Sequence, residues 1–267
     1  MIIICVIIGY SWMNGDVAST ENTTDNSGEE EKIEDDSEPL RNFSKQQLER
    51  FDGKIDENTE EVKPVYLSLS GTVFDVSNAR NFYGPDGPYE VFAGHECGVA
   101  LAKMSFDKTY LDDISGCKSL NFGENNELEN WIEKFTHIRC YPIVGHLIPD
   151  EKIPDASRVL TKSDLAANNG TGETPDGYAT APIYVGVGEK VFDVSFGGVT
   201  FYGKGCSYEL FAGRDVSRAL AKMSFKPEDT ENTSILDLSE KEIKVMNDWI
   251  KSFKDRKKYP IVGVLEK

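Results

Sequence analysis

The sequence that decides the fold occurs twice: residues 82–94 read FYGPDGPYEVFAG, and residues 201–213 read FYGKGCSYELFAG. The hexapeptide LAKMSF at residues 101–106 returns without change at residues 220–225. The offset between matching positions is 118 or 119 residues throughout. Solenoid units recur about every 20–50 residues, so a period this long indicates two copies of a complete small domain.

The length and charge of the chain agree with two domains and a tail. Its 267 residues leave room for two cores of about 100 residues each. The net charge is −17, and residues 1–63 carry −10 of it, with 6 Lys or Arg against 16 Asp or Glu. The acid is therefore concentrated near the N-terminus. No basic patch stands out elsewhere, so we expect no nucleic-acid partner.

The N-terminal segment is expected to lie outside the domains. Residues 1–13 are apolar but shorter than the roughly 20 residues that span a bilayer, and they fit a signal peptide or a short anchor. A buried strand is the alternative. Residues 14–42 form an acidic stretch that we expect to be a disordered spacer. Four N-glycosylation sequons, one of them at Asn42, are compatible with the endoplasmic reticulum, with other parts of the endomembrane system or with secretion.

Each copy contains the same series of predicted elements, and together they indicate an α+β fold. A capped helical turn begins after Ser44 or Thr161, and alternation around a Gly turn predicts a β-hairpin. A short helix follows the aromatic loop, and then a longer helix with one apolar face and a final strand. The expected hairpins are 65–76 and 183–194, the short helices 96–103 and 215–222, and the final strands 142–147 and 260–265. We expect domains at residues 43–148 and 159–267, joined by a linker at 149–158.

The repeated aromatic loop is the candidate binding site. In the first copy it holds four aromatic residues and three glycines within 13 positions. Glycine lets the backbone approach a flat ligand closely, and aromatic rings supply apolar walls. A tyrosine can also bind ferric iron as tyrosinate, because the charge of the metal lowers the pKa of a phenol. The alternative is a buried turn whose aromatic side chains only pack.

The residues that recur in both copies do not indicate a disulfide framework or a catalytic site. The cysteines of the first domain are Cys97, Cys117 and Cys140, and none has a cysteine at the equivalent place in the second domain. We therefore expect no disulfide framework. No Ser-His-Asp, Cys-His or paired-carboxylate arrangement recurs either, so we expect the protein not to be an enzyme.

The repeated motifs resemble a known family. The chain is similar to two tandem cytochrome b5-like domains of the membrane-associated progesterone receptor and neudesin family. The residues that carry the resemblance are FDG at 51–53, VFDV at 73–76, the loop at 82–94, FAGRD at 211–215, SRALA at 217–221 and Trp249. The resemblance covers nearly everything outside the N-terminal tail.

The resemblance implies a heme b cofactor that is held by tyrosine instead of the histidine pair of ordinary cytochrome b5. Tyr89 and Tyr208 are the implied axial ligands of the iron. The other implied heme-binding residues are Tyr83 and Tyr141 in the first copy, and Tyr202, Lys258 and Tyr259 in the second. Cys140 stands where the lysine is expected in the first copy, so we expect the second copy to bind heme more tightly. Alternatives are His95 as a sixth ligand and Cys206 as a thiolate ligand.

Three functions remain open on these residues. The first is a non-enzymatic, heme-binding and steroid-binding carrier or regulator of the endomembrane system. The second is a heme-free interaction module, secreted or lumenal, which recognises a protein or a sterol-like ligand through the same groove. The third is a redox partner of heme-thiolate monooxygenases, and the missing histidine pair weakens it. A heme-thiolate monooxygenase or another membrane protein is the expected protein partner.

Overall fold

The computed structural model describes residues 38–56 and 59–266. The predicted leader, 1–13, and most of the predicted spacer lie outside the described residues. Strand β1 (Arg41–Phe43) begins inside the stretch that was expected to be disordered, because Phe43 is fully buried and β1 pairs with a strand at the far end of its domain. No helix within the described residues is long and apolar enough to cross a membrane.

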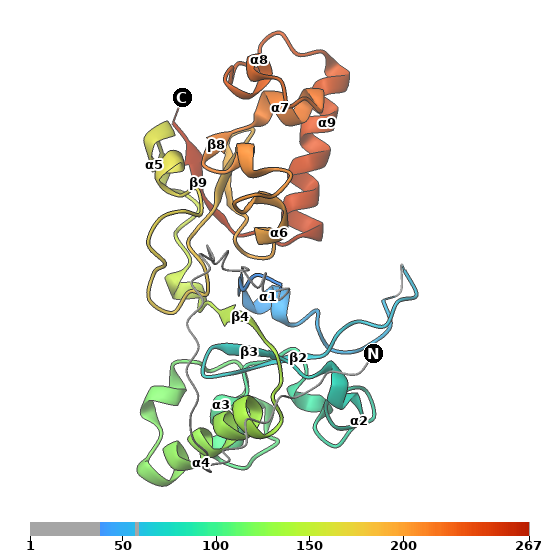
Figure 1. Cartoon of the computed structure of the whole chain (residues 1–267), viewed down its shortest axis with the longest axis vertical. Coiled ribbons are helices and arrows are strands. Elements are labelled where there is room, and N and C mark those ends of the chain that lie inside the picture. Colours follow the sequence, from blue (N-terminus) through green and yellow to red (C-terminus); the bar gives the residue numbers. More distant parts are fainter. Residues whose placement is uncertain (1–37, 57–58, 267) are drawn as a thin grey trace, which may run out of the picture. The chain divides into compact units, whose positions relative to one another are not determined.

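The first repeat is built on a four-stranded sheet that has helices on both faces (Figure 1). The strand order is β1-β4-β3-β2, in which β1 and β4 are parallel and the other pairs are antiparallel. Its helices and strands after β1 are α1 (Lys45–Leu48), β2 (Tyr66–Leu69), β3 (Thr72–Asp75), α2 (Arg80–Tyr83), α3 (Gly98–Ala102), α4 (Phe122–Glu133) and β4 (Ile143–Leu147).

The second repeat contains the same elements in the same order, with one short strand and one short helix added. Its sheet order is β5-β9-β7-β6-β8. The elements are β5 (Val159–Leu160), α5 (Lys162–Ala167), β6 (Tyr184–Val187), β7 (Lys190–Asp193), α6 (Val199–Tyr202), β8 (Arg214–Asp215), α7 (Ser217–Lys222), α8 (Pro227–Thr230), α9 (Glu240–Lys251) and β9 (Ile261–Leu265). In Figure 1, α9 runs along one side of this sheet.

The predicted hairpins and caps are confirmed. Strands β2 and β3 pair around Gly71, and β6 and β7 pair around Gly188; both glycines have the positive φ that such tight turns require. The side chains of Ser44 and Thr161 accept hydrogen bonds from the third residue of α1 and α5, as a capping box predicts. The short helices begin two residues later than expected, at α3 and α7.

Each long helix ends in a widened turn. Helix α4 passes into a π-helical turn at Lys134–Ile138, and α9 passes into one at Ser252–Arg256. Phe135 and Phe253 lie in these turns and are buried beneath the sheets, as the apolar stripe predicts. A π turn holds one more residue than an α turn and therefore changes which side chains after it face the core.

The two repeats contact each other through β1 and α1. The Asn42 side chain is fully buried and donates to Ser195 Oγ at 2.9 Å. Gln47 Nε2 donates to the backbone oxygens of Phe196 at 2.6 Å and Lys257 at 3.0 Å. Because the amide nitrogen of Asn42 is buried and hydrogen-bonded, the sequon at this position is unavailable to a glycan.

The cysteines of the described residues form no disulfide. They are Cys97, Cys117, Cys140 and Cys206, and all four are free.

Candidate functional site

The predicted tyrosine pairs have the same geometry in the two repeats. Tyr83 and Tyr89 have ring centroids 5.7 Å apart with 32° between the ring planes, and Tyr202 and Tyr208 are 5.7 Å apart at 38°. In each pair the first tyrosine ends a short helix and is buried, whereas the second precedes a 3₁₀ turn and is half-buried. The structure therefore brings each predicted axial tyrosine beside its predicted neighbour.

A phenylalanine from the repeated hexapeptide packs against each candidate axial tyrosine. Phe106 lies 5.7 Å from Tyr89, and Phe225 lies 5.5 Å from Tyr208, between ring centroids. Both phenylalanines are more than half exposed. Sequence reasoning missed them as site residues, although the exact recurrence of LAKMSF was a signal.

A third tyrosine completes each aromatic cluster, and it lies two residues before the final strand of its repeat. Phe253 lies 6.3 Å from Tyr202 and 5.4 Å from Tyr259, and the first repeat has the same arrangement around Phe135. Burial raises the pKa of Tyr259 to about 12 and raises the pKa of Tyr202 further. Both phenols are therefore neutral hydrogen-bond donors at physiological pH.

The tyrosines of the second repeat line a cavity of about 640 Å³. This volume is within the range of about 300–1,000 Å³ that small-molecule sites occupy. Its aromatic walls are Phe196, Phe201, Tyr202, Tyr208, Trp249, Phe253 and Tyr259. Residues of the first repeat, including Arg41 and Phe51, line the same cavity, and its lining includes none of Tyr83, Tyr89 and Tyr141.

Lys258 does not line this cavity, and the neighbouring Lys257 does. The backbone of Lys258 has a φ of +56°, and Cys140, its counterpart in the first repeat, has a φ of +49°. Cys140 is exposed, and its thiol lies 3.5 Å from the backbone oxygen of His137. Both repeats therefore have a left-handed backbone at the residue before the last tyrosine, but that residue is a lysine in the second repeat and a cysteine in the first.

The alternative ligands lie apart from the tyrosine clusters or outside the cavity. His95 Nδ1 is 3.0 Å from a carboxylate oxygen of Asp112, and both residues line a different cavity. Cys206 contacts the backbone oxygen of Val199 at 3.6 Å and is absent from the residues that line the 640 Å³ cavity. The part of the chain that the structure describes contains no cluster of three His, Cys, Asp or Glu side chains able to hold a metal ion.

Comparison with known proteins identifies the second repeat. Residues 161–266 match the family described as "Cytochrome b5-like Heme/Steroid binding domain". The "Probable steroid-binding protein 3" of Arabidopsis thaliana is 47% identical over 104 residues, which are 39% of this chain and 94% of that protein. The "Cytochrome P450 regulator dap1" of Schizosaccharomyces pombe is 36% identical over 110 residues, which are 39% of this chain and 65% of that protein.

Relatives whose names describe membrane-associated proteins match this chain over only part of their own length. The human "Membrane-associated progesterone receptor component 2" is 33% identical over 115 residues, which are 43% of this chain and 49% of that protein. A solved structure of an Arabidopsis thaliana protein with a cytochrome b5 like fold is 43% identical, covers 42% of this chain and 94% of its own, and has a TM-score of 0.34. The chain therefore belongs to the family of proteins with a cytochrome b5-like heme/steroid-binding domain.

Proposed function

We propose that the protein is a non-enzymatic heme-binding protein whose second repeat holds heme b with Tyr208 as the axial ligand. The observation that carries this proposal is the cavity of about 640 Å³, which combines aromatic walls, two neutral phenols and one half-buried tyrosine. In this arrangement Tyr202 and Tyr259 donate hydrogen bonds to the bound group. Lys258, which does not line the cavity, remains a predicted partner of a heme propionate. A ferric heme with a single tyrosinate ligand favours the oxidised iron and suits a carrier or regulator better than an electron shuttle.

The first repeat is proposed to be a second copy of the same domain, with a weaker site. Support comes from its matching element order and from the equal spacing of Tyr83 and Tyr89. Tyr89 is its candidate axial ligand, and Tyr83 and Tyr141 are its candidate hydrogen-bonding residues. Cys140 supplies no positive charge to a heme propionate, so the affinity is expected to be lower than in the second repeat.

The biological role is proposed by analogy with the relatives. Their names describe steroid-binding proteins, membrane proteins and a regulator of cytochrome P450. We therefore place the protein in the endomembrane system, as a carrier or regulator with a heme-thiolate monooxygenase as a candidate partner. Steroid binding in the same cavity, without heme, is the second candidate function, and the names of the relatives favour it.

Titration of the full chain with hemin tests the proposal. We expect the wild-type protein to develop a ferric tyrosinate absorption band, and Tyr208→Phe to remove the tighter binding phase. Tyr89→Phe is expected to affect only a weaker phase, and Tyr110→Phe, a tyrosine outside both pairs, to change neither. Loss of the band in Tyr89→Phe alone would reverse the ranking of the repeats. A wild-type chain that binds a steroid but no hemin would refute the proposal.

A further inference from the structure

The lining of the large cavity is basic in a chain that is strongly acidic overall. The net charge of the chain is −17. Its cavity nevertheless has five cationic side chains and one carboxylate, that of Asp56, among its lining residues. The cations are Arg41, Arg50, Lys63, Arg256 and Lys257. Such a concentration of one sign of charge in an aromatic pocket indicates an anionic ligand.

Three of these five cations belong to the first repeat, and Arg41 is the most enclosed of them. Its guanidinium carbon lies 4.1 Å from the ring centroid of Phe43 and 5.1 Å from that of Phe51. Its Nη1 atom lies 2.9 Å from the position that a Cβ atom would take at Gly197 of the second repeat. Burial lowers the pKa of Arg41, as it does for a guanidinium withdrawn from water.

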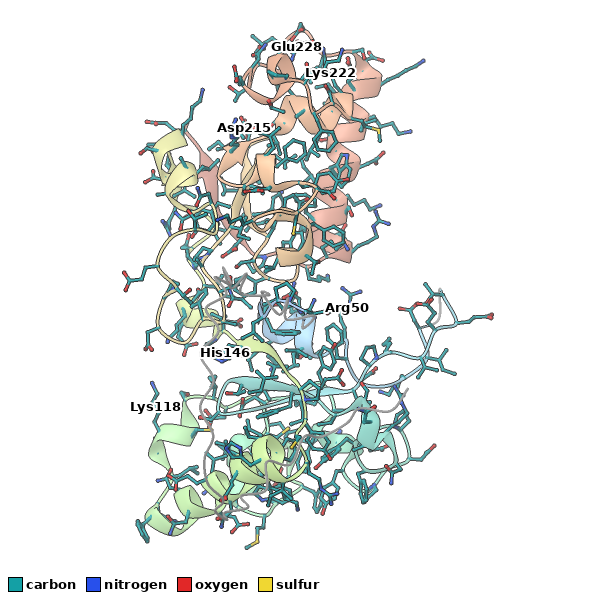
Figure 2. The ribbon with its side chains drawn as sticks, in the orientation of Figure 1. Arg50, Lys118, His146, Asp215, Lys222 and Glu228 are labelled. Carbon is teal, nitrogen blue, oxygen red and sulfur yellow. The ribbon has the colours of Figure 1, made fainter. Side chains whose placement is uncertain are left out.

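The other cationic side chains differ in how many interactions they already make with the protein. Lys63 Nζ lies 3.4 Å from a carboxylate oxygen of Asp52 in its own repeat. Arg50 is exposed beside α1 (Figure 2), and its Nη1 donates to the backbone oxygen of Arg256. Lys257 Nζ lies 5.3 Å from the ring centroid of Phe201. Arg50 and Lys257 are exposed and line the same cavity as Arg41, so both keep donors available to a ligand.

The second repeat is altered at the place where the first repeat reaches it. Phe82 lies five positions after Ser77 in the first repeat, and Phe201 lies six positions after Ser195 in the second. The extra residue falls in the segment Phe196–Gly197. In this segment the Phe196 backbone oxygen accepts from Gln47, and Gly197 leaves room for Arg41. The change in sequence offset therefore coincides with the contact that brings the arginines to the cavity.

We propose that Arg41 and Arg50 of the first repeat complete the ligand site of the second repeat by binding carboxylate groups of its ligand. Guanidinium groups form paired, charge-assisted hydrogen bonds with carboxylates, and an aromatic pocket at their side holds the flat apolar part of the molecule. The ligand is thus a flat apolar molecule with carboxylate side groups, and an uncharged steroid cannot use the arginines. This inference rests on the proposed heme site and makes the first repeat part of it.

The test compares hemin with hemin dimethyl ester, in which both carboxylates are masked. Both are titrated into the full chain as wild type, as the double variant Arg41→Met and Arg50→Gln, and as Lys118→Gln. Lys118 is exposed and lies well away from Arg50 (Figure 2), so it controls for lost charge alone. We expect the double variant to bind hemin about tenfold or more weakly, and to bind the ester as the wild type does. The Lys118→Gln variant is expected to match the wild type with both ligands.

A further variant and a spectral readout separate the outcomes. Arg41→Lys with Arg50→Lys keeps both charges and is expected to recover most of the hemin affinity, while the thermal unfolding curve reports folding for every variant. Equal hemin affinity in the wild type and in the folded double variant, with a tyrosinate band that depends on Tyr208, would overturn this inference alone. Absence of a hemin complex in the wild type would overturn the proposed function, and this inference with it.

Discussion

Asp193 makes the stability of the second repeat depend on pH in the direction opposite to that of ordinary carboxylates. It ends β7, its side chain is 1% exposed, and its Oδ1 atom accepts from the backbone N–H groups of Ile183 at 3.2 Å and Ser195 at 3.0 Å. Burial raises its pKa from the usual 3.8 to about 6, against the effect of these hydrogen bonds. Each tenfold change in a protonation equilibrium is about 1.4 kcal/mol, so the rise corresponds to about 3 kcal/mol.

The sign follows from which state binds the proton more tightly. The folded protein holds the Asp193 proton up to a pH of about 6, whereas the unfolded chain loses it near pH 3.8. This stabilising contribution is therefore complete below about pH 4 and is lost as the pH rises through about 6. Asp193→Asn keeps the Oδ1 acceptor and removes the titration. We expect the free energy of unfolding of the variant, relative to wild type, to increase by about 3 kcal/mol between pH 4 and pH 7.

Urea unfolding of the full chain, followed by circular dichroism at a series of pH values, measures this difference. The other carboxylates are common to both proteins and cancel in the comparison. Asp75→Asn is the matched control, because Asp75 occupies the same place in the first repeat but is only half-buried. A difference between Asp193→Asn and wild type that stays constant from pH 4 to pH 7 would refute the reasoning.

Two further substitutions probe the contact between the repeats. Gln47→Ala removes hydrogen bonds of 2.6 and 3.0 Å to two backbone oxygens of the second repeat. We therefore expect the free energy of unfolding to fall by about 2–3 kcal/mol. An unchanged midpoint of urea unfolding would contradict this expectation. Gly145→Ala places a Cβ atom 1.8 Å from the backbone oxygen of Arg41, so we expect faster amide exchange in β1 and weaker hemin binding. Gly123→Ala, at an exposed and open position, is expected to show neither effect.

The parts of the fold that depend on local sequence were predicted well. Alternation of apolar and polar residues around Gly71 and Gly188 predicted the hairpins. A hydroxyl side chain three residues before a side chain that accepts hydrogen bonds predicted the helix caps at Ser44 and Thr161. The placement of Tyr202 beside Tyr208 agrees with what the family resemblance implied for one short loop. Each of these features depends on residues close together in the chain, which is why one sequence was enough to find them.

The parts that were missed depend on contacts between distant residues. Strands β1 and β5 are three and two residues long, too short to show alternation, and they form only because the final strand of each repeat accepts them. The basic side of the cavity depends on how one repeat docks against the other, which no local pattern records. Lys258 stays a prediction: the neighbouring Lys257 lines the cavity, and Lys258 does not.

The buried bridge from Asn42 to Ser195 bears on how such a chain can diversify. After a duplication, one copy is often regarded as a spare that is free to drift while the other keeps the original role. Here the first segment of the first copy also stabilises the second copy, because its side-chain amide groups donate hydrogen bonds to polar atoms of that copy. Exchanging the order of the copies, or separating them, would strip Asn42 and Gln47 of these partners. The two halves have therefore become complementary parts and are no longer interchangeable duplicates.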